Sequence, residues 1–106
     1  MSYYVAKPEV DEDLVRHAKW IELDNPEAAR RFLEAALKSF EFLASFPEAG
    51  PKASFKHERL KDVRFWVLPP PFNRWLVFYT IEREVVTIIR VLHSSQNWRE
   101  EPEGLL

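Results

Sequence analysis

Two apolar runs near the C-terminal end of this chain of 106 residues constrain its fold more than any other feature. The first, Arg74–Tyr79, reads RWLVFY, and the second, Val85–His93, reads VVTIIRVLH. Both are rich in β-branched and aromatic residues, which are typical of strands. The segment between them, Thr80–Glu84, is mostly polar and suits a hairpin loop. The two runs therefore predict neighbouring antiparallel strands, the second of which ends at a histidine.

Two further strands are predicted elsewhere in the chain. Val63–Leu68 has the same strand-like composition and stops at Pro69–Pro71, because proline cannot sit inside a sheet. Met1–Ala6 is short and aromatic, which indicates an opening strand. The three later strands follow one another at hairpin spacing and predict an antiparallel meander.

Two helices are predicted between the opening strand and the meander. Apolar residues recur at three- and four-residue spacing from Pro8 onward, which indicates an amphipathic helix. Asn25 and Pro26 suit the cap and first turn of a second helix of about 20 residues, which Pro47 stops. The link between the helices is short, so they fold back as a hairpin. The apolar stripe of the second helix comprises Ala29, Phe32, Leu33, Ala36, Leu37, Phe40, Leu43 and Ala44.

Together these elements predict an α+β fold in the order β-α-α-β-β-β. The helical hairpin forms one layer and packs on an antiparallel sheet, the second layer. Residues 1–98 are expected to form a single domain. Residues 99–106 form a short acidic tail that is loose unless Leu105 and Leu106 dock.

Composition excludes several classes of chemistry. The chain has no cysteine, which excludes disulfides and thiolate metal sites, and two glycines are too few for a phosphate-binding loop. No apolar run approaches the roughly 20 residues that span a bilayer, and the N-terminal residues do not resemble a signal peptide. We therefore expect a cytoplasmic protein without membrane association.

Charge is distributed unevenly along the chain. Residues 47–98 carry eight Lys/Arg and five Asp/Glu, whereas residues 1–46 carry six and nine. A local basic surplus of this size fits an acidic protein partner or a phosphate backbone, and scattered solubilising charge explains it equally well. It is far weaker than the basic stripe of a dedicated nucleic-acid binder.

The residues best suited to catalysis are His93, Arg64 and Arg90. A histidine exchanges protons near neutral pH, and an arginine stabilises negative charge at a phosphate. The alternative is that His93 is a hydrogen-bonding cap at a strand end, which is the commoner role. His17 and His57 have no partner at metal-ligand spacing, so neither a metal nor a cofactor is predicted.

The order of several short motifs resembles the RelE/ParE superfamily of toxins from type II toxin–antitoxin systems. The matching pieces are Asn25–Arg30 (NPEAAR), Leu43–Pro47 (LASFP), His57–Lys61 (HERLK), Leu76–Tyr79 (LVFY) and Arg90–His93 (RVLH). Each motif is loose, but their order covers nearly the whole chain. The order of helices and strands predicted above is also that of this superfamily.

This resemblance implies a small toxin of the kind that arrests growth or stabilises plasmids. Such a toxin is held inactive by a cognate antitoxin, and the resemblance implies either a homo-oligomer or a hetero-oligomer with that antitoxin. RelE-like members cut mRNA in the ribosome, whereas ParE-like members poison DNA gyrase without cleaving anything themselves. A non-toxic remnant that only binds its partner is a third possibility.

The resemblance to the nuclease branch is incomplete. Arg64 and His93 match positions that nuclease members use. However, Trp66 and Ser95 stand where those members carry basic residues, and Ser94 stands where a tyrosine is expected. The RVLH ending is common in ParE-like members. The sequence therefore favours a ParE-like gyrase inhibitor, with His93, Arg64 and Arg90 as catalytic candidates only if the chain is RelE-like.

Overall fold

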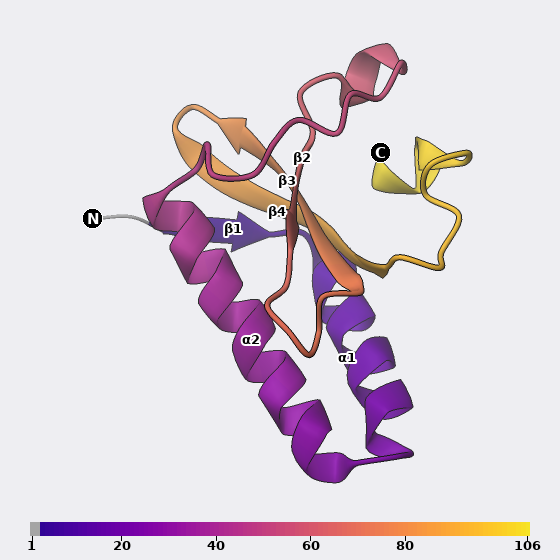
Figure 1. Ribbon diagram of the computed structural model, residues 1–106. Coiled ribbons are helices and arrows are strands. Elements are labelled where there is room, and N and C mark those ends of the chain that lie inside the picture. The colour runs from indigo at the N-terminus through magenta and orange to yellow at the C-terminus, as the bar shows by residue number, and fades with distance from the viewer. Residues whose placement is uncertain (1–2) are drawn as a thin grey trace.

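The fold was analysed in a computed structural model that describes residues 3–106 (Figure 1). Two long helices lie side by side as one layer, and a twisted sheet forms the other. Met1 and Ser2, which the sequence assigned to the opening strand, lie outside the described residues. The elements are β1 (Tyr4–Ala6), α1 (Pro8–Glu22), α2 (Pro26–Ser45), the 3-10 turn η1 (Glu58–Leu60), β2 (Arg64–Val67), β3 (Trp75–Glu82), β4 (Val85–His93) and a second 3-10 turn, η2 (Pro102–Leu105).

The predicted α+β class and the order of elements are confirmed. The strands lie in the order β1-β4-β3-β2, and β2, β3 and β4 form the antiparallel meander. β1 pairs with β4 in parallel, so the four-stranded sheet as a whole is mixed. The helical hairpin carries the chain from β1, at one edge of the sheet, to β2 at the other. Because β1 and β2 lie at opposite edges of the sheet, no hairpin can join them and a long crossover connection is needed.

Both helices begin where the sequence predicts. Pro8 occupies the first turn of α1, and Pro26 occupies the first turn of α2. The side chain of Asn25 accepts a hydrogen bond from the backbone N–H of Ala28 at 3.1 Å, which satisfies one of the free donors at a helix start.

The main core lies between the helices and one face of the sheet. Phe32, Phe40 and Leu43 of α2 are at most 1% exposed and pack with Val77 and Tyr79 of β3, which are fully buried. The apolar stripe predicted for α2 thus supplies much of this core. Its member Leu37 is an exception, since 47% of this residue is exposed.

A second apolar cluster covers the opposite face of the sheet. Phe78 points into it, and the segment before β2 contributes Leu60 and the partly buried Phe55. The C-terminal residues contribute Leu105, which is only 3% exposed, while Leu106 remains 42% exposed. The tail therefore docks through one of the two leucines considered for that role. After β4 ends, the chain turns back, so that the tail lies beside the sheet (Figure 1).

The hairpin between β3 and β4 is tighter than predicted. Thr80, Ile81 and Glu82 continue β3, and only Arg83 and Glu84 form the turn, with φ angles of 52° and 68°. Positive φ at both central residues is the hallmark of the two-residue turns whose twist matches that of the strands. The polar composition of residues 80–84 led the sequence analysis to end β3 too early. The strand continues to Glu82 because Ile81 packs against the main core.

Candidate functional site

His93 is the last residue of β4 and is held in place from several sides. Its ring Nδ1 accepts the backbone N–H of Ser95 at 3.1 Å and lies 2.8 Å from the hydroxyl of that residue. Its backbone N–H donates to the side-chain oxygen of Gln96 at 2.7 Å. The ring also packs at right angles to Trp75, with 4.7 Å between ring centroids. The histidine is therefore positioned where a core strand meets solvent.

Arg90 is engaged in a bidentate ion pair with Asp13 of α1. Its Nε lies 2.7 Å from Oδ2 of Asp13, and its Nη2 lies 2.8 Å from Oδ1. A third nitrogen donates to the carbonyl of Gly104 at 3.0 Å. Burial acts to raise the pKa of Asp13, but hydrogen bonds from Arg90 and from the backbone of Val91 outweigh it and lower that pKa. The hydrogen bonds between the two side chains raise the pKa of Arg90, so the pair stays ionised.

Asp13 and His17 also seal the outer edge of β4. β1 covers this edge only as far as Ile88. Further on, Asp13 accepts the backbone N–H of Val91 at 3.0 Å, and His17 Nε2 donates to its carbonyl at 2.8 Å. Burial lowers the pKa of His17, which is 6% exposed. Two helical side chains thus take the place of a neighbouring strand.

Arg64 holds the turn that follows α2. Its guanidinium donates to the carbonyl of Gly50 at 2.6 Å. The hydroxyl of Tyr79 holds the same turn, because it donates to the carbonyl of Pro47 at 2.6 Å and accepts the N–H of Gly50 at 2.9 Å. Burial raises the pKa of Tyr79. One guanidinium nitrogen of Arg64 is therefore engaged with backbone carbonyls.

The three catalytic candidates do not converge on one point. His93 pairs across the sheet with Trp75 at the start of β3, whereas Arg64 pairs with Tyr79, four residues further along that strand. Four residues along a strand span about 13 Å. Arg90 and His93 are three residues apart on β4, so they face opposite sides of the sheet. These three side chains are therefore better placed to stabilise the fold than to bind one phosphate together. Their catalytic roles remain a prediction.

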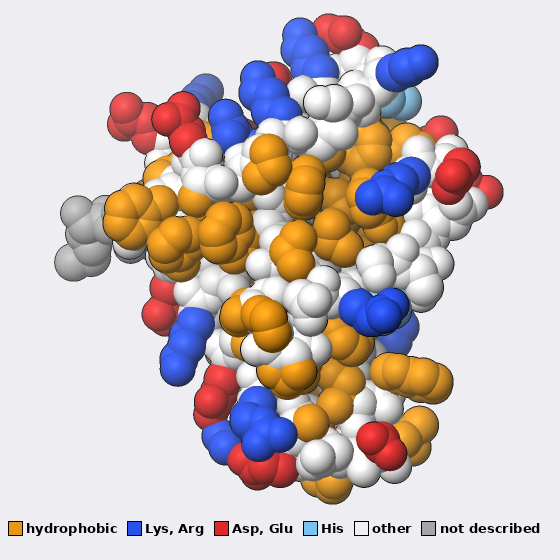
Figure 2. Space-filling view, in the orientation of Figure 1, with side chains coloured by type: hydrophobic (Ala, Val, Ile, Leu, Met, Phe, Trp, Pro, Cys, Tyr) orange, Lys and Arg blue, Asp and Glu red, His pale blue; other side chains and the backbone are white. Residues whose placement is uncertain are grey.

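Sequence analysis missed an exposed aromatic patch at the C-terminal end of α2. We define it as Phe42, Phe46 and Trp66; the ring of Phe42 lies between the other two, tilted against each, with 5.1 Å to either centroid. Phe42 is 40% exposed and Phe46 is 59% exposed. Figure 2 shows apolar side chains gathered over this end of the molecule. The signal was in the sequence, since Phe42 and Phe46 are four residues apart and fall outside the core stripe of α2.

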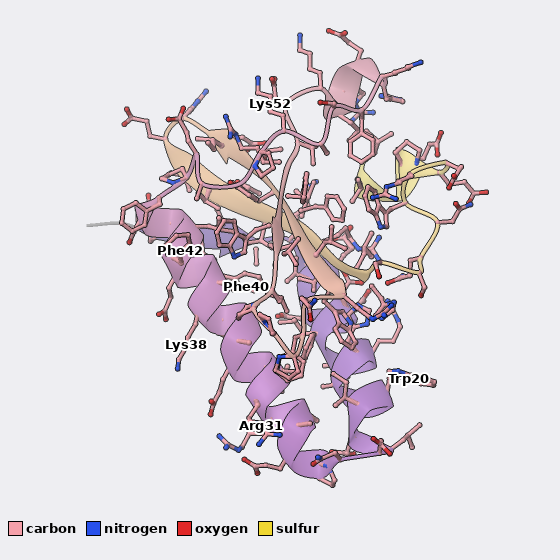
Figure 3. All side chains as sticks on the ribbon, in the orientation of Figure 1. Trp20, Arg31, Lys38, Phe40, Phe42 and Lys52 are labelled. Carbon is pink, nitrogen blue, oxygen red and sulfur yellow. The ribbon has the colours of Figure 1, made fainter. Side chains whose placement is uncertain are left out.

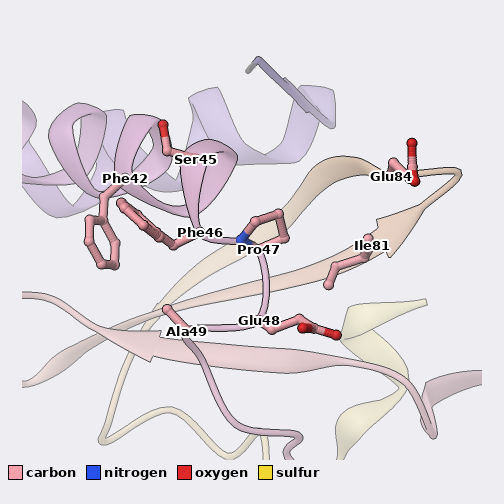
Figure 4. Close-up of a pocket in the computed structure, with 8 residues that line it drawn as sticks. All are labelled: Phe42, Ser45, Phe46, Pro47, Glu48, Ala49, Ile81 and Glu84. Atoms are coloured by element: carbon pink, nitrogen blue, oxygen red, sulfur yellow. The ribbon is translucent and has the colours of Figure 1, made fainter. Parts of the chain in front are cut away.

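A cavity of about 720 Å³ lies beside the aromatic patch (Figure 4). Phe42 and Phe46 form one wall, and Pro47, Ala49 and Ile81 continue the apolar lining. Glu48 and Glu84 lie at its margin as the charged members of the lining. Such an apolar hollow bordered by polar groups is typical of a surface that receives a partner.

Trp66 places the patch on β2, the outer strand of the sheet, whose other side is paired with the preceding loop at Arg64 and Phe65. Within residues 3–106 no three His, Asp or Glu side chains are grouped as metal ligands would be. No helix in the same described range has the length and apolar character needed to cross a membrane.

Comparison with protein families decides the affiliation. The family model for the ParE toxin of the type II toxin–antitoxin system parDE matches residues 4–98. The chain belongs to the ParE toxin family. This confirms the resemblance to the RelE/ParE superfamily and makes the chain a type II toxin by family. The match also spans every helix and strand of the two layers, from β1 to β4.

A solved structure of the chromosomal ParDE system from P. aeruginosa shares the fold of this ParE-family chain. The TM-score is 0.69 at 15% sequence identity, and the alignment covers 88% of this chain and 96% of that one. No curated protein matches by sequence comparison. The fold is thus shared at low identity, and the details of the surface belong to this chain.

Proposed function

We propose that this ParE-family chain is a toxin that poisons DNA gyrase by binding it, and that a cognate antitoxin neutralises it in the cytoplasm. The family match over residues 4–98 carries the proposal, because that family is described as the toxin of parDE. The solved relative is likewise described as a ParDE toxin–antitoxin system.

The state of the basic residues supports binding over catalysis. Arg90 is bound to a buried carboxylate and Arg64 to backbone carbonyls. Arg90, whose three nitrogens are all engaged, has less to offer a phosphate in a transition state, which needs donors placed in advance around the developing charge.

The aromatic patch supports the antitoxin as partner. Aromatic side chains are enriched among the residues that dominate binding energy at protein interfaces. An amphipathic antitoxin segment would cover Phe42 and Phe46 with its apolar side, and the end of β2 beyond Phe65, which the preceding loop does not pair with, offers a place for an extended stretch of the same partner.

A paired variant tests the antitoxin surface. Phe46→Asp places a charge in the patch and is expected to weaken binding of the antitoxin encoded beside this gene by about 100-fold, within the range for interface hot spots. Leu23→Asp is the matched control, because Leu23 is 83% exposed at the far end of the helical hairpin. Binding is measured by calorimetry. Equal affinities for the two variants would place the antitoxin elsewhere.

The target is tested by inducing the chain without its antitoxin and following growth, DNA damage and transcript integrity in the same culture. A gyrase poison arrests growth, induces the DNA-damage response and leaves transcripts whole. The purified chain is then expected to inhibit supercoiling by gyrase. Failure to do so at excess protein would exclude this target, and absence of growth arrest would indicate a non-toxic remnant.

The ribosome-dependent endonuclease is separated from gyrase inhibition by one substitution. If His93 is an acid or base in mRNA cleavage, His93→Ala abolishes toxicity and transcript cutting while circular dichroism shows an intact fold. For a gyrase inhibitor the transcripts are whole before and after the substitution.

A further inference from the structure

A second cavity, of about 390 Å³, opens between α1 and the end of β4, away from the aromatic patch. Arg16 and Trp20 of α1 form one wall, and Trp75 and His93 form another. Neither the antitoxin surface nor the gyrase proposal uses this cavity. Its chemistry therefore requires a separate explanation.

Two side chains that line this cavity carry hydrogen-bond donors without partners. Trp75 is 9% exposed, and its buried indole Nε1 has no hydrogen-bond partner within the described residues. A buried donor left unpaired costs about 1–3 kcal/mol, which is why such groups are rare.

His93 supplies the second free donor. The backbone N–H of Ser95 points at Nδ1, so Nδ1 must act as an acceptor. The neutral ring therefore carries its proton on Nε2, and no hydrogen bond to Nε2 is seen within residues 3–106. The hydrogen bond from the backbone N–H of Ser95 thus fixes the tautomer of His93 and leaves its Nε2–H available as a donor.

Arg16 adds a positive charge at the same cavity. One of its nitrogens lies 3.2 Å from Asp13, but its side chain is 55% exposed and the guanidinium has further N–H groups. No Asp or Glu lies among the described residues that line this cavity. The lining is therefore rich in donors and lacks an anion, which calls for a ligand that accepts hydrogen bonds and is negatively charged.

The aromatic side chains specify the rest of the ligand. Trp20 is 70% exposed and projects from α1 away from α2 (Figure 3). The opposite wall carries Trp75 and His93, whose rings meet edge to face. Exposed aromatic faces bind planar rings by stacking, and an arginine beside them suits a phosphate.

We propose that this cavity binds a nucleotide, with the base against Trp20, the phosphate on Arg16 and His93 Nε2, and the indole ring of Trp75 beside it. The shared chemistry is a base bearing a 5′-phosphate. It is supplied by a free mononucleotide or by the 5′ end of a single strand.

The indole N–H resonance of Trp75 tests the proposal directly in ¹⁵N-labelled protein, with the resonance assigned from Trp75→Phe. Titration with adenosine or uridine monophosphate is expected to shift it in a saturable way. The nucleoside without phosphate should bind about tenfold more weakly, because charge-assisted hydrogen bonds are lost. A shift with mononucleotide identifies a free nucleotide as sufficient, whereas a shift only with a 5′-phosphorylated oligonucleotide identifies a strand end.

Arg16→Gln is expected to weaken the nucleotide affinity about tenfold, and it leaves Asp13 paired with Arg90. Arg31→Gln on α2 is the matched control and should leave the affinity unchanged, since Arg31 lies on the other helix (Figure 3). No Trp75 shift with millimolar mononucleotide or oligonucleotide would overturn the proposal. Equal loss in the two variants would also overturn it, because the effect would then be one of net charge.

Discussion

Two stretches of the sheet that no neighbouring strand covers are closed by different means: the part of β4 beyond its pairing with β1, and the outer side of β2. Along β4, side chains from α1 close the edge, because Asp13 and His17 bind both backbone groups of Val91. Along β2, the backbone of the preceding loop closes it. There the N–H of Phe65 donates to the carbonyl of Pro51 at 3.0 Å, and the N–H of Ala53 donates to the carbonyl of Val63 at 2.9 Å.

The difference determines what each edge can tolerate. The edge at β4 depends on a buried carboxylate that must keep its cationic partner, so removing one member leaves a costly unpaired charge. The edge at β2 depends on close approach of backbone at Gly50. It also ends beside exposed apolar surface, where Val67 is 41% exposed. The loop pairs with β2 only as far as Phe65, so the end of β2 at Val67 is the part of the two edges better suited to pairing with a partner.

The largest effect is expected from breaking the closure at β4. Asp13→Ala removes the acceptor for Val91 and leaves Arg90 partly buried without its counter-ion, which should destabilise the fold by about 3–5 kcal/mol. Urea unfolding measures the change. Asp11→Ala is the control in the same helical turn, with an expected cost below about 1 kcal/mol. Similar losses for both variants would show that this edge is not a special weak point.

A smaller effect is expected from breaking the closure at β2. A Cβ at Gly50 would lie 2.3 Å from the carbonyl oxygen of Phe65 and 2.7 Å from the hydroxyl of Tyr79. Gly50→Ala should therefore cost about 1–3 kcal/mol through overpacking. Gly104→Ala is the matched control, because its nearest neighbour would lie at 3.7 Å. Thermal unfolding of both variants checks the difference, and equal melting temperatures would contradict it.

The hairpin between the two central strands touches neither edge and tests whether the sheet can be stabilised independently of them. Arg83 and Glu84 adopt positive φ without being Asn or Gly, which is a conformational cost. The double variant R83N/E84G supplies the residue pair that such a turn prefers and should stabilise the fold by about 0.5–2 kcal/mol. A higher urea midpoint with an unchanged slope is the expected result. A lower midpoint would show that the native side chains contribute interactions of their own.

The smallest effect concerns pH at the β4 edge. The folded pKa of His17 is below its ordinary value of 6.5, so the folded state resists protonation. Its contribution is present above pH 6.5 and is lost as pH falls from there through the folded pKa. Stability should therefore decline on acidification from about pH 7.5 to about pH 5.5. His17→Gln should flatten this part of the profile, and the control His57→Gln, in the loop before β2, should not. An unchanged slope in His17→Gln would assign the effect to another group.

Sequence analysis was most successful where the conformational preferences of neighbouring residues alone determine the local structure. Asn25 followed by Pro26 identified the start of α2, and the β-branched runs identified β3 and β4. It was less successful where distant contacts intervened. The polar segment Thr80–Glu84 looked like a loop, but Ile81 packs on the main core and extends the strand.

The candidate site shows the same division. His93 was predicted at a strand end, and it lies there. The sequence offered no means of seeing that Arg90 meets Asp13, since 77 residues separate them. It also gave no reason to group Trp20 with Trp75 and His93, which come together only when α1 packs along β4.

By itself, therefore, the sequence determined the two-layer class, the order of its elements and the resemblance to the RelE/ParE superfamily. These follow from local periodicity, from turn-forming residues and from short motifs, all of which are properties of neighbours in the chain. Tertiary structure alone decided which arginines are already occupied, which edge of the sheet stays accessible and which aromatic rings face solvent. Those outcomes depend on where distant segments meet, and packing sets that through the shape and charge of the whole molecule.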